Sequence, residues 1–66
     1  MTITQKELAD RVRQARIACG MKQEDVAENL EVSRPTYTQI ENGNRAISSL
    51  ELTRLAYLFG RDLREF

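Results

Sequence analysis

A short polar segment in the middle of the chain has residue types that can contact another molecule. Its polar side consists of Arg34, Pro35, Thr36, Thr38 and Gln39. Tyr37 and Ile40, three residues apart, form the opposite, apolar side. Guanidinium and carboxamide groups can form paired hydrogen bonds, including bonds to the edges of nucleic acid bases. The same residue types also suit a solvated helix surface, so the elements around them must decide between these interpretations.

Residues for covalent or metal chemistry are scarce. The sequence has one cysteine, Cys19, and no histidine, so it lacks a Cys–His nucleophile and base and the usual ligands of zinc. It also lacks a glycine-rich loop of the kind that holds phosphates. We therefore expect no enzyme activity, no cofactor and no metal site. We expect Cys19 to be a core residue.

The composition is typical of one small folded domain. The chain has 66 residues, of which 41% are hydrophobic and 30% are charged, and its low content of glycine and proline favours helices. We expect a single domain over residues 1–66, which a longer chain could contain. The apolar runs are too short to span a bilayer, and there is no signal-peptide pattern. These features predict a cytoplasmic protein that does not contact membranes.

Charge is distributed unevenly, although the formal net charge is zero. Residues 1–22 carry an excess of three positive charges, whereas residues 23–31 carry four negative charges. A contact with nucleic acid must therefore use a local basic surface. The acidic group consists of Glu24, Asp25, Glu28 and Glu31. We interpret it as a solvated face, with a protein-binding surface as the alternative.

Start and stop signals divide the chain into helices. Capping-box patterns begin helices after Thr4 and after Ser48, and a serine followed by a proline begins another at Ser33. One more helix is expected over residues 23–30, and Asp62 could cap a last one. The glycine stop signals are Gly20, Gly43 and Gly60. The sequence thus predicts an all-α fold, a compact bundle of five short helices.

Apolar spacing indicates which faces of these helices are buried. The first helix has one apolar stripe at spacings of four, three and four residues, formed by Leu8, Val12, Ala15 and Cys19. The helix after Ser48 is apolar nearly all round, which predicts a place in the centre of the bundle. Its apolar residues are Leu50, Leu52, Leu55, Ala56, Leu58 and Phe59.

The segment from Gln23 to Gly43 has the pattern of a helix-turn-helix. Two short helices are joined by three or four residues, and the small side chain of Ala27 lets their backbones approach at a steep angle. The apolar residues of this segment are Val26, Leu30, Val32, Tyr37 and Ile40.

With these motifs, the sequence resembles the phage repressor and Cro-type (XRE) helix-turn-helix family. The matching stretches are MKQEDVA at 21–27, VSR at 32–34, QIENG at 39–43, SLEL at 49–52 and LA at 55–56. The resemblance covers nearly the whole chain. It implies the lambda repressor-like DNA-binding fold. Members of the family are mostly transcriptional regulators that bind operator DNA as dimers.

The resemblance also implies a role for each matching residue. The helix from Ser33 to about Asn42 would enter the major groove, with base contacts from Arg34, Pro35, Thr36, Thr38 and Gln39. Arginine suits guanine O6 and N7, and glutamine suits adenine N6 and N7. The implied phosphate contacts are Lys22, Gln23, Ser33, Asn42, Asn44 and Arg45. Arg16 and Glu41 would form a structural ion pair.

Three residues depart from the family pattern. Glu31 stands where glycine is usual, so a non-glycine residue is expected at positive φ, at a cost of about 1 kcal/mol. Lys22 replaces a serine or threonine cap. Tyr37 replaces a branched aliphatic residue. We expect the Tyr37 ring in the core, with its hydroxyl reaching solvent, a polar partner or the DNA backbone.

Together these observations predict sequence-specific binding of double-stranded DNA by a transcriptional regulator, with a repressor as the first expectation and a homodimer on the DNA. The alternative is a protein-interaction module or antitoxin-type domain of the same fold. In that case a partner protein would bind the acidic face of the helix over residues 23–30.

Overall fold

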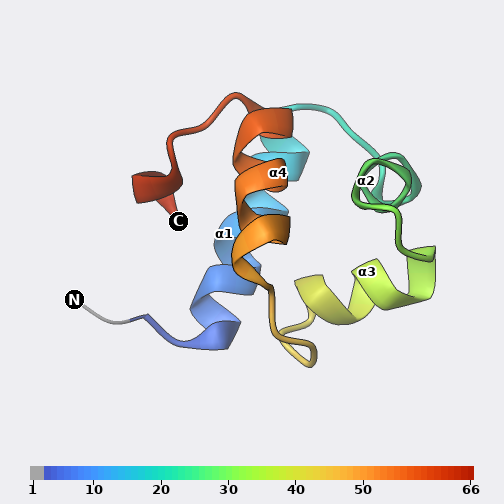
Figure 1. The fold of residues 1–66 in the computed structure, drawn as a ribbon, viewed down its shortest axis with the longest axis horizontal. Helices are drawn as coiled ribbons and strands as arrows, with labels where there is room; N and C mark the ends of the chain where they lie inside the picture. The colour runs from blue at the N-terminus through green and yellow to red at the C-terminus, as the bar shows by residue number, and fades with distance from the viewer. Residues whose placement is uncertain (1–2) are drawn as a thin grey trace.

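The computed structural model describes residues 3–66, which form four α-helices, one 3-10 turn and no strand. The elements are α1 (Gln5–Ala18), α2 (Gln23–Leu30), α3 (Arg34–Glu41), α4 (Ser49–Phe59) and the turn η1 (Leu63–Glu65). The helices α1 and α4 lie against each other, and α2 and α3 pack on one side of that pair (Figure 1). The all-α expectation is confirmed.

The expected fifth helix is wrong, because the segment after Asp62 forms only a 3-10 turn. Its backbone bonds close over three residues, from Glu65 N to Asp62 O at 2.9 Å and from Phe66 N to Leu63 O at 3.1 Å. The Asp62 carboxylate caps this turn by accepting from the backbone N–H of Arg64 at 2.9 Å. The cap was predicted correctly, but bonds over three residues define a tighter helix than the α-helix.

Local capping explains where the helices begin. The Thr4 hydroxyl accepts from Glu7 N at 3.0 Å, and the Glu7 carboxylate accepts from Thr4 N at 3.1 Å. Ser48 and Glu51 form the same reciprocal pair before α4. Ser33 caps α3 by accepting from the N–H of Thr36 at 3.2 Å. These bonds satisfy backbone donors that the first helical turn leaves free, and they confirm the predicted starts.

The core takes side chains from all four helices. Five of its residues are fully buried, namely Val12, Val26, Tyr37, Ile40 and Leu55. Ala27 is also buried, where α2 meets α3. This packing fixes α3 on the body of the domain and leaves its other face toward solvent.

Two predictions of burial are wrong. Cys19 is exposed, at the C-cap position that follows the last residue of α1, Ala18. Its thiol donates a weak hydrogen bond to the backbone carbonyl of Phe59, at 3.6 Å. Helix α4 is not central either, since Leu50 is 63% exposed and Tyr57 is 90% exposed. Only Leu55, Ala56 and Phe59 of α4 are buried, because α1 and α2 cover one side of this helix and leave the other uncovered.

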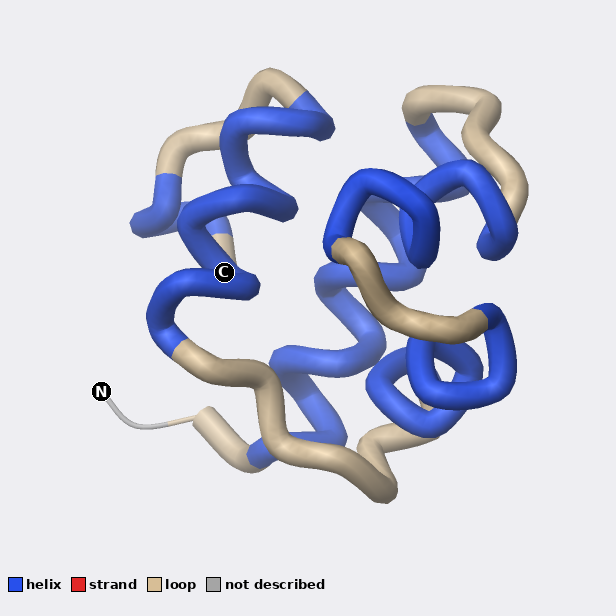
Figure 2. The backbone as a smooth tube through the Cα atoms, turned by 45° about the vertical axis from the view of Figure 1, so that its right-hand side comes forward, coloured by secondary structure: helices blue, strands red, loops and turns tan. Residues whose placement is uncertain are grey.

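The connection between α3 and α4 runs past the first turn of α1 (Figure 2). Gln5 Nε2 donates to the Gly43 carbonyl at 2.7 Å. Gly43 has a φ of +78°, and a Cβ built on it would lie 3.2 Å from the Cα of Lys6. A glycine is therefore needed both for the backbone conformation and for the close approach of α1.

Among the described helices, none has the length and apolar character needed to cross a membrane.

Candidate nucleic-acid interface

The turn between α2 and α3 sets the position of α3. Glu31 ends α2 with a φ of 60°, in the left-handed region that the sequence predicted for it. At the other end of α2, Lys22 precedes the first helical residue, and its ammonium group cannot accept a hydrogen bond. The Asp25 carboxylate accepts from Lys22 N at 3.2 Å, which supplies half of a capping box. Helix α2 and the turn after it thus form although Lys22 and Glu31 are both unfavourable at their positions.

The outward side of α3 carries the residues expected to contact bases. Arg34, Pro35 and Gln39 are exposed, and Thr36 and Thr38 are half-buried. The guanidinium of Arg34 makes no hydrogen bond or ion pair within residues 3–66. An unpaired cation at the exposed start of a short helix is free to bind an external acceptor.

Gln39 is joined to the loop that follows α3. Asn44 Nδ2 donates to Gln39 Oε1 at 3.1 Å, and both residues are exposed. This bond orients the Gln39 amide and leaves its Nε2 group free of partners in the described part of the chain. A carboxamide oxygen has two lone pairs, so Oε1 can accept a second bond. Gln39 therefore still presents a donor and an acceptor side by side.

Gln23 is the centre of a polar network between α2 and α3. Its Nε2 group donates to Glu41 Oε1 at 3.0 Å, and its Oε1 accepts from the Thr38 hydroxyl at 3.1 Å. The same hydroxyl lies 3.0 Å from the carbonyl oxygen of Arg34. A hydroxyl has one hydrogen, so Thr38 divides it between two acceptors within the protein. Gln23 and Thr38 are thus less free to act than Arg34.

Arg16 and Glu41 are brought together as a nearly buried ion pair. Arg16 Nε lies 2.6 Å from Glu41 Oε2, and Nη2 lies 3.2 Å from Oε1. A third nitrogen of Arg16 donates to the Met21 carbonyl at 2.8 Å. Burial alone would raise the pKa of the Glu41 carboxyl, but the hydrogen bonds from Arg16 and Gln23 outweigh it and hold this pKa below its ordinary value. The pair joins α1 to the end of α3.

The Tyr37 hydroxyl does not have the partner expected for it. The ring is fully buried, as predicted, but the hydroxyl oxygen makes no hydrogen bond with any residue from 3 to 66. The expected contact with solvent or the DNA backbone is therefore wrong, because the ring places the hydroxyl in the core, where the polar groups beside it are those of Glu41 and Arg16. Burial, together with the nearby Glu41 carboxylate, raises the pKa of Tyr37.

The Arg45 side chain pairs with a glutamate that the sequence pattern did not connect to it. Its two terminal nitrogens lie 3.0 and 2.9 Å from the two carboxylate oxygens of Glu51. Glu51 is also the capping-box residue of α4. The hydrogen bond from Arg45 and the capping bonds hold the pKa of the Glu51 carboxyl below its ordinary value. Arg45 is thus held in place with its charge paired to Glu51.

The other residues expected at phosphates are open to solvent. Lys22, Ser33 and Asn42 are exposed, and the Ser33 hydroxyl also donates to the Thr36 hydroxyl at 2.8 Å. On α2, the acidic residues Glu24, Asp25, Glu28 and Glu31 are all exposed. This agrees with a solvated face, although Glu31 lies 3.9 Å from Arg54.

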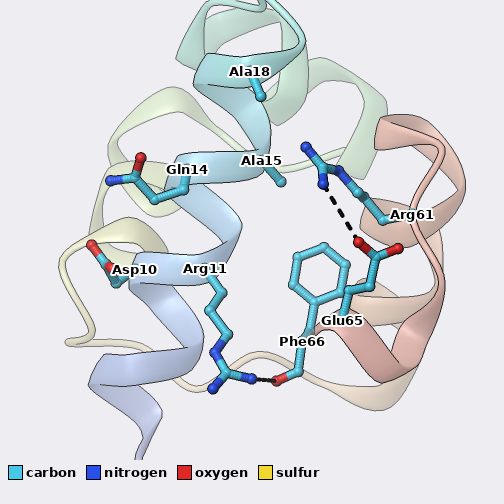
Figure 3. A pocket seen from close by; sticks show the side chains of 8 residues that line it. All are labelled: Asp10, Arg11, Gln14, Ala15, Ala18, Arg61, Glu65 and Phe66. Atoms are coloured by element: carbon cyan, nitrogen blue, oxygen red, sulfur yellow. Dashed lines mark hydrogen bonds and ion pairs between the residues drawn. The ribbon is translucent and has the colours of Figure 1, made fainter.

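A separate hollow of about 420 Å³ lies between α1 and the C-terminal turn (Figure 3). Arg11 Nη1 donates to the Phe66 carbonyl at 3.1 Å, and Arg61 faces Glu65 at 3.5 Å. None of the residues expected to contact DNA lines this hollow. Among residues 3–66, no group of acidic and cysteine side chains has the arrangement of a metal site.

Comparison with known proteins connects this arrangement to a family. Residues 12–66 match the family model described as Helix-turn-helix (HTH_3). No curated protein matches the sequence. The fold is similar to that of solved regulator structures, as three of them illustrate.

The restriction-modification controller protein C.AhdI from Aeromonas hydrophila is 28% identical, with a TM-score of 0.83 over 92% of this chain and 88% of that protein. The clp gene regulator ClgR from Corynebacterium glutamicum is 22% identical, with a TM-score of 0.86 over 98% of this chain and 84% of that structure. ComR from Streptococcus suis is 30% identical, with a TM-score of 0.82 over 98% of this chain but only 21% of that protein.

Proposed function

Because the chain belongs to the XRE-type helix-turn-helix family of DNA-binding transcription regulators, we propose that it binds one duplex sequence specifically and represses transcription there. In this proposal α3 is the recognition helix and lies in the major groove, with its first residues at the base edges. The protein acts in the cytoplasm.

The observation that carries the proposal is the free guanidinium of Arg34 on a helix whose opposite face is buried. Tyr37 and Ile40 are fully buried, so α3 is held rigidly while Arg34 stays exposed and unpaired within residues 3–66. Arg34 would bind guanine O6 and N7, and Gln39 would bind adenine N6 and N7. Pro35 and the methyl group of Thr36 would contact a thymine methyl group, and Thr38 would lie beside them at the base edges.

Residues at both ends of α3 would hold the phosphate backbone. These residues are Lys22, Gln23, Ser33, Asn42, Asn44 and Arg45. The bond of Gln23 to Glu41 uses one amide hydrogen, so the second remains for a phosphate oxygen. Arg45 would approach phosphate while still paired with Glu51. Such contacts fix the register of a protein on DNA without reading its sequence.

One domain of this size makes few DNA contacts, so useful affinity requires two copies. The formal net charge of zero removes the general attraction that would otherwise support a single copy. We propose that a homodimer binds two half-sites about one helical turn apart. A sequence selected from random duplexes should then contain an inverted repeat.

The proposal is tested by selecting bound sequences from a random duplex pool and then measuring the affinity of variants for the selected site. Arg34→Ala should lose about 1–3 kcal/mol of binding free energy per half-site, or about 5- to 150-fold in affinity for each, and should relax the preference at one base pair of each half-site. Arg61→Ala, in the hollow between α1 and the C-terminal turn, is the matched control. It should keep both the affinity and the base preference of the wild type.

Two results would contradict the proposal. If the selection enriches no sequence, the specific recognition by α3 fails. If Glu28→Lys on α2 abolishes a protein complex while Arg34→Ala changes nothing, the protein-interaction alternative replaces it. A reporter with the selected site across a promoter tests repression, because expression should fall when the wild-type protein is present and recover with Arg34→Ala.

A further inference from the structure

The loop between α3 and α4 has little free positive charge. Arg45 is the only basic residue in residues 42–48, and both of its terminal nitrogens are bound to Glu51. Asn42 and Asn44 are neutral. If this loop lies at the DNA backbone, as the proposed function requires, most of the positive charge beside it must come from another element.

Helix α1 supplies such charge at the same place. Gln5 donates to the Gly43 carbonyl at 2.7 Å, and the backbone and side chain of Lys6 lie 3.2 Å from the position that a Cβ on Gly43 would take. The first turn of α1 is therefore fixed against the loop. Lys6 is exposed, and its ammonium group makes no ion pair or hydrogen bond within residues 3–66.

Arg13 continues this charge along α1. It lies seven residues after Lys6, which places both on one side of the helix, about two turns apart. Arg16, one turn beyond Arg13, reaches Glu41 at the end of α3, so this side of α1 flanks α3. Arg13 is exposed and has no ion-pair partner in the described chain. Asp10 lies between the two cations in sequence but pairs with neither.

We propose that Lys6 and Arg13 bind phosphates of the duplex beside the loop of residues 42–48, so that α1 is part of the DNA-binding surface. This proposal rests on the proposed function, because it requires α3 to lie in the major groove. In this proposal α1 provides the cations that bind phosphate, because the Arg45 guanidinium is already paired with Glu51. Phosphate contacts of this kind add affinity for every sequence and leave the base preference unchanged.

The test is the salt dependence of binding to the selected duplex, measured by fluorescence anisotropy with the full chain. Each lost phosphate contact reduces the slope of log K against log salt concentration by about 0.9. Because the proposed homodimer carries two copies of each residue, Lys6→Gln and Arg13→Gln should each reduce the slope by about 1.8, and the double variant should reduce it by about 3.6. Lys6→Arg keeps the charge and should keep the slope. All variants should retain the preferred base sequence.

The control is Arg64→Gln, which removes an equal charge from the C-terminal turn, where the Arg64 side chain is 90% exposed. A slope that falls for the α1 variants alone supports the proposal. Unchanged slopes for Lys6→Gln and Arg13→Gln overturn it while the proposed function stands. Equal reductions in all three variants also overturn it, since net charge alone would then explain the effect. If the wild-type chain binds no duplex, the proposed function fails and this proposal fails with it.

Discussion

The two ends of α3 differ in what surrounds their charged residues. At the start, Arg34 is exposed and has no partner within residues 3–66. At the end, the Glu41 side chain is 2% exposed and accepts bonds from Arg16 and Gln23. Removing one partner of a buried ion pair destabilises the fold, whereas a free exposed charge remains available for a ligand. A substitution at the end of α3 should therefore lower stability, whereas a substitution at its start should weaken DNA binding and leave stability nearly unchanged.

The largest effect is expected from breaking the buried pair. Glu41→Ala leaves the Arg16 guanidinium without its partner and should lower the free energy of unfolding by about 3–5 kcal/mol. Arg34→Ala should change it by no more than about 0.5 kcal/mol. Urea unfolding followed by circular dichroism measures both. A loss below about 1 kcal/mol for Glu41→Ala would show that the two ends do not differ in this way.

A smaller effect should appear as a dependence of stability on pH. The pKa of Glu41 in the folded protein is depressed below its ordinary value of 4.5. Its contribution to stability is therefore complete above the unfolded-state pKa and is lost as the pH falls through the folded-state pKa. The wild type should thus lose stability below about pH 4.5 more steeply than Glu41→Gln. Parallel curves for the two proteins, measured by thermal unfolding, would rule out Glu41 as a source of this dependence.

The smallest effect concerns the Tyr37 hydroxyl between the two ends. This group is buried without a hydrogen bond to residues 3–66, and an unsatisfied buried group costs about 1–3 kcal/mol. Tyr37→Phe removes the hydroxyl and keeps the ring, so it should raise the free energy of unfolding by about 1 kcal/mol. If unfolding instead becomes easier, the hydroxyl contributes a favourable contact with Glu41 or Arg16, and the polar network at the end of α3 includes Tyr37.

The parts of the fold that depend on neighbouring residues could be predicted from the sequence. Capping boxes act over three residues, so the starts of α1 and α4 were correct, and the left-handed Glu31 followed from a single turn position. The hydrogen bond from Gln23 to Glu41 spans 18 residues, and no local pattern encodes it. The pairing of Arg45 with Glu51 depends on the path of the loop between α3 and α4, which neither helical spacing nor a capping pattern determines.

Burial at the edges of the domain was also beyond the sequence pattern. The helical spacing places Cys19 on the apolar stripe of α1, and its backbone is still helical, but it lies at the end of the helix, where it is exposed. On α4, leucines occur on several sides, and their spacing does not say which side the other helices cover. The exposure of Leu50 and Tyr57 follows only from the arrangement of all the helices.

The Thr38 hydroxyl has a consequence for how quickly the interface can adapt. Its single hydrogen can point to Gln23 Oε1 or to the Arg34 carbonyl, at 3.1 and 3.0 Å. Rotation about one C–O bond moves it from one acceptor to the other without loss of a hydrogen bond, and side-chain rotations of this size take picoseconds to nanoseconds. The side-chain oxygen of Gln23, Oε1, can thus exchange the Thr38 hydroxyl for a water molecule while the backbone of α3 stays in place. This exchange is far faster than the separation of a protein from DNA.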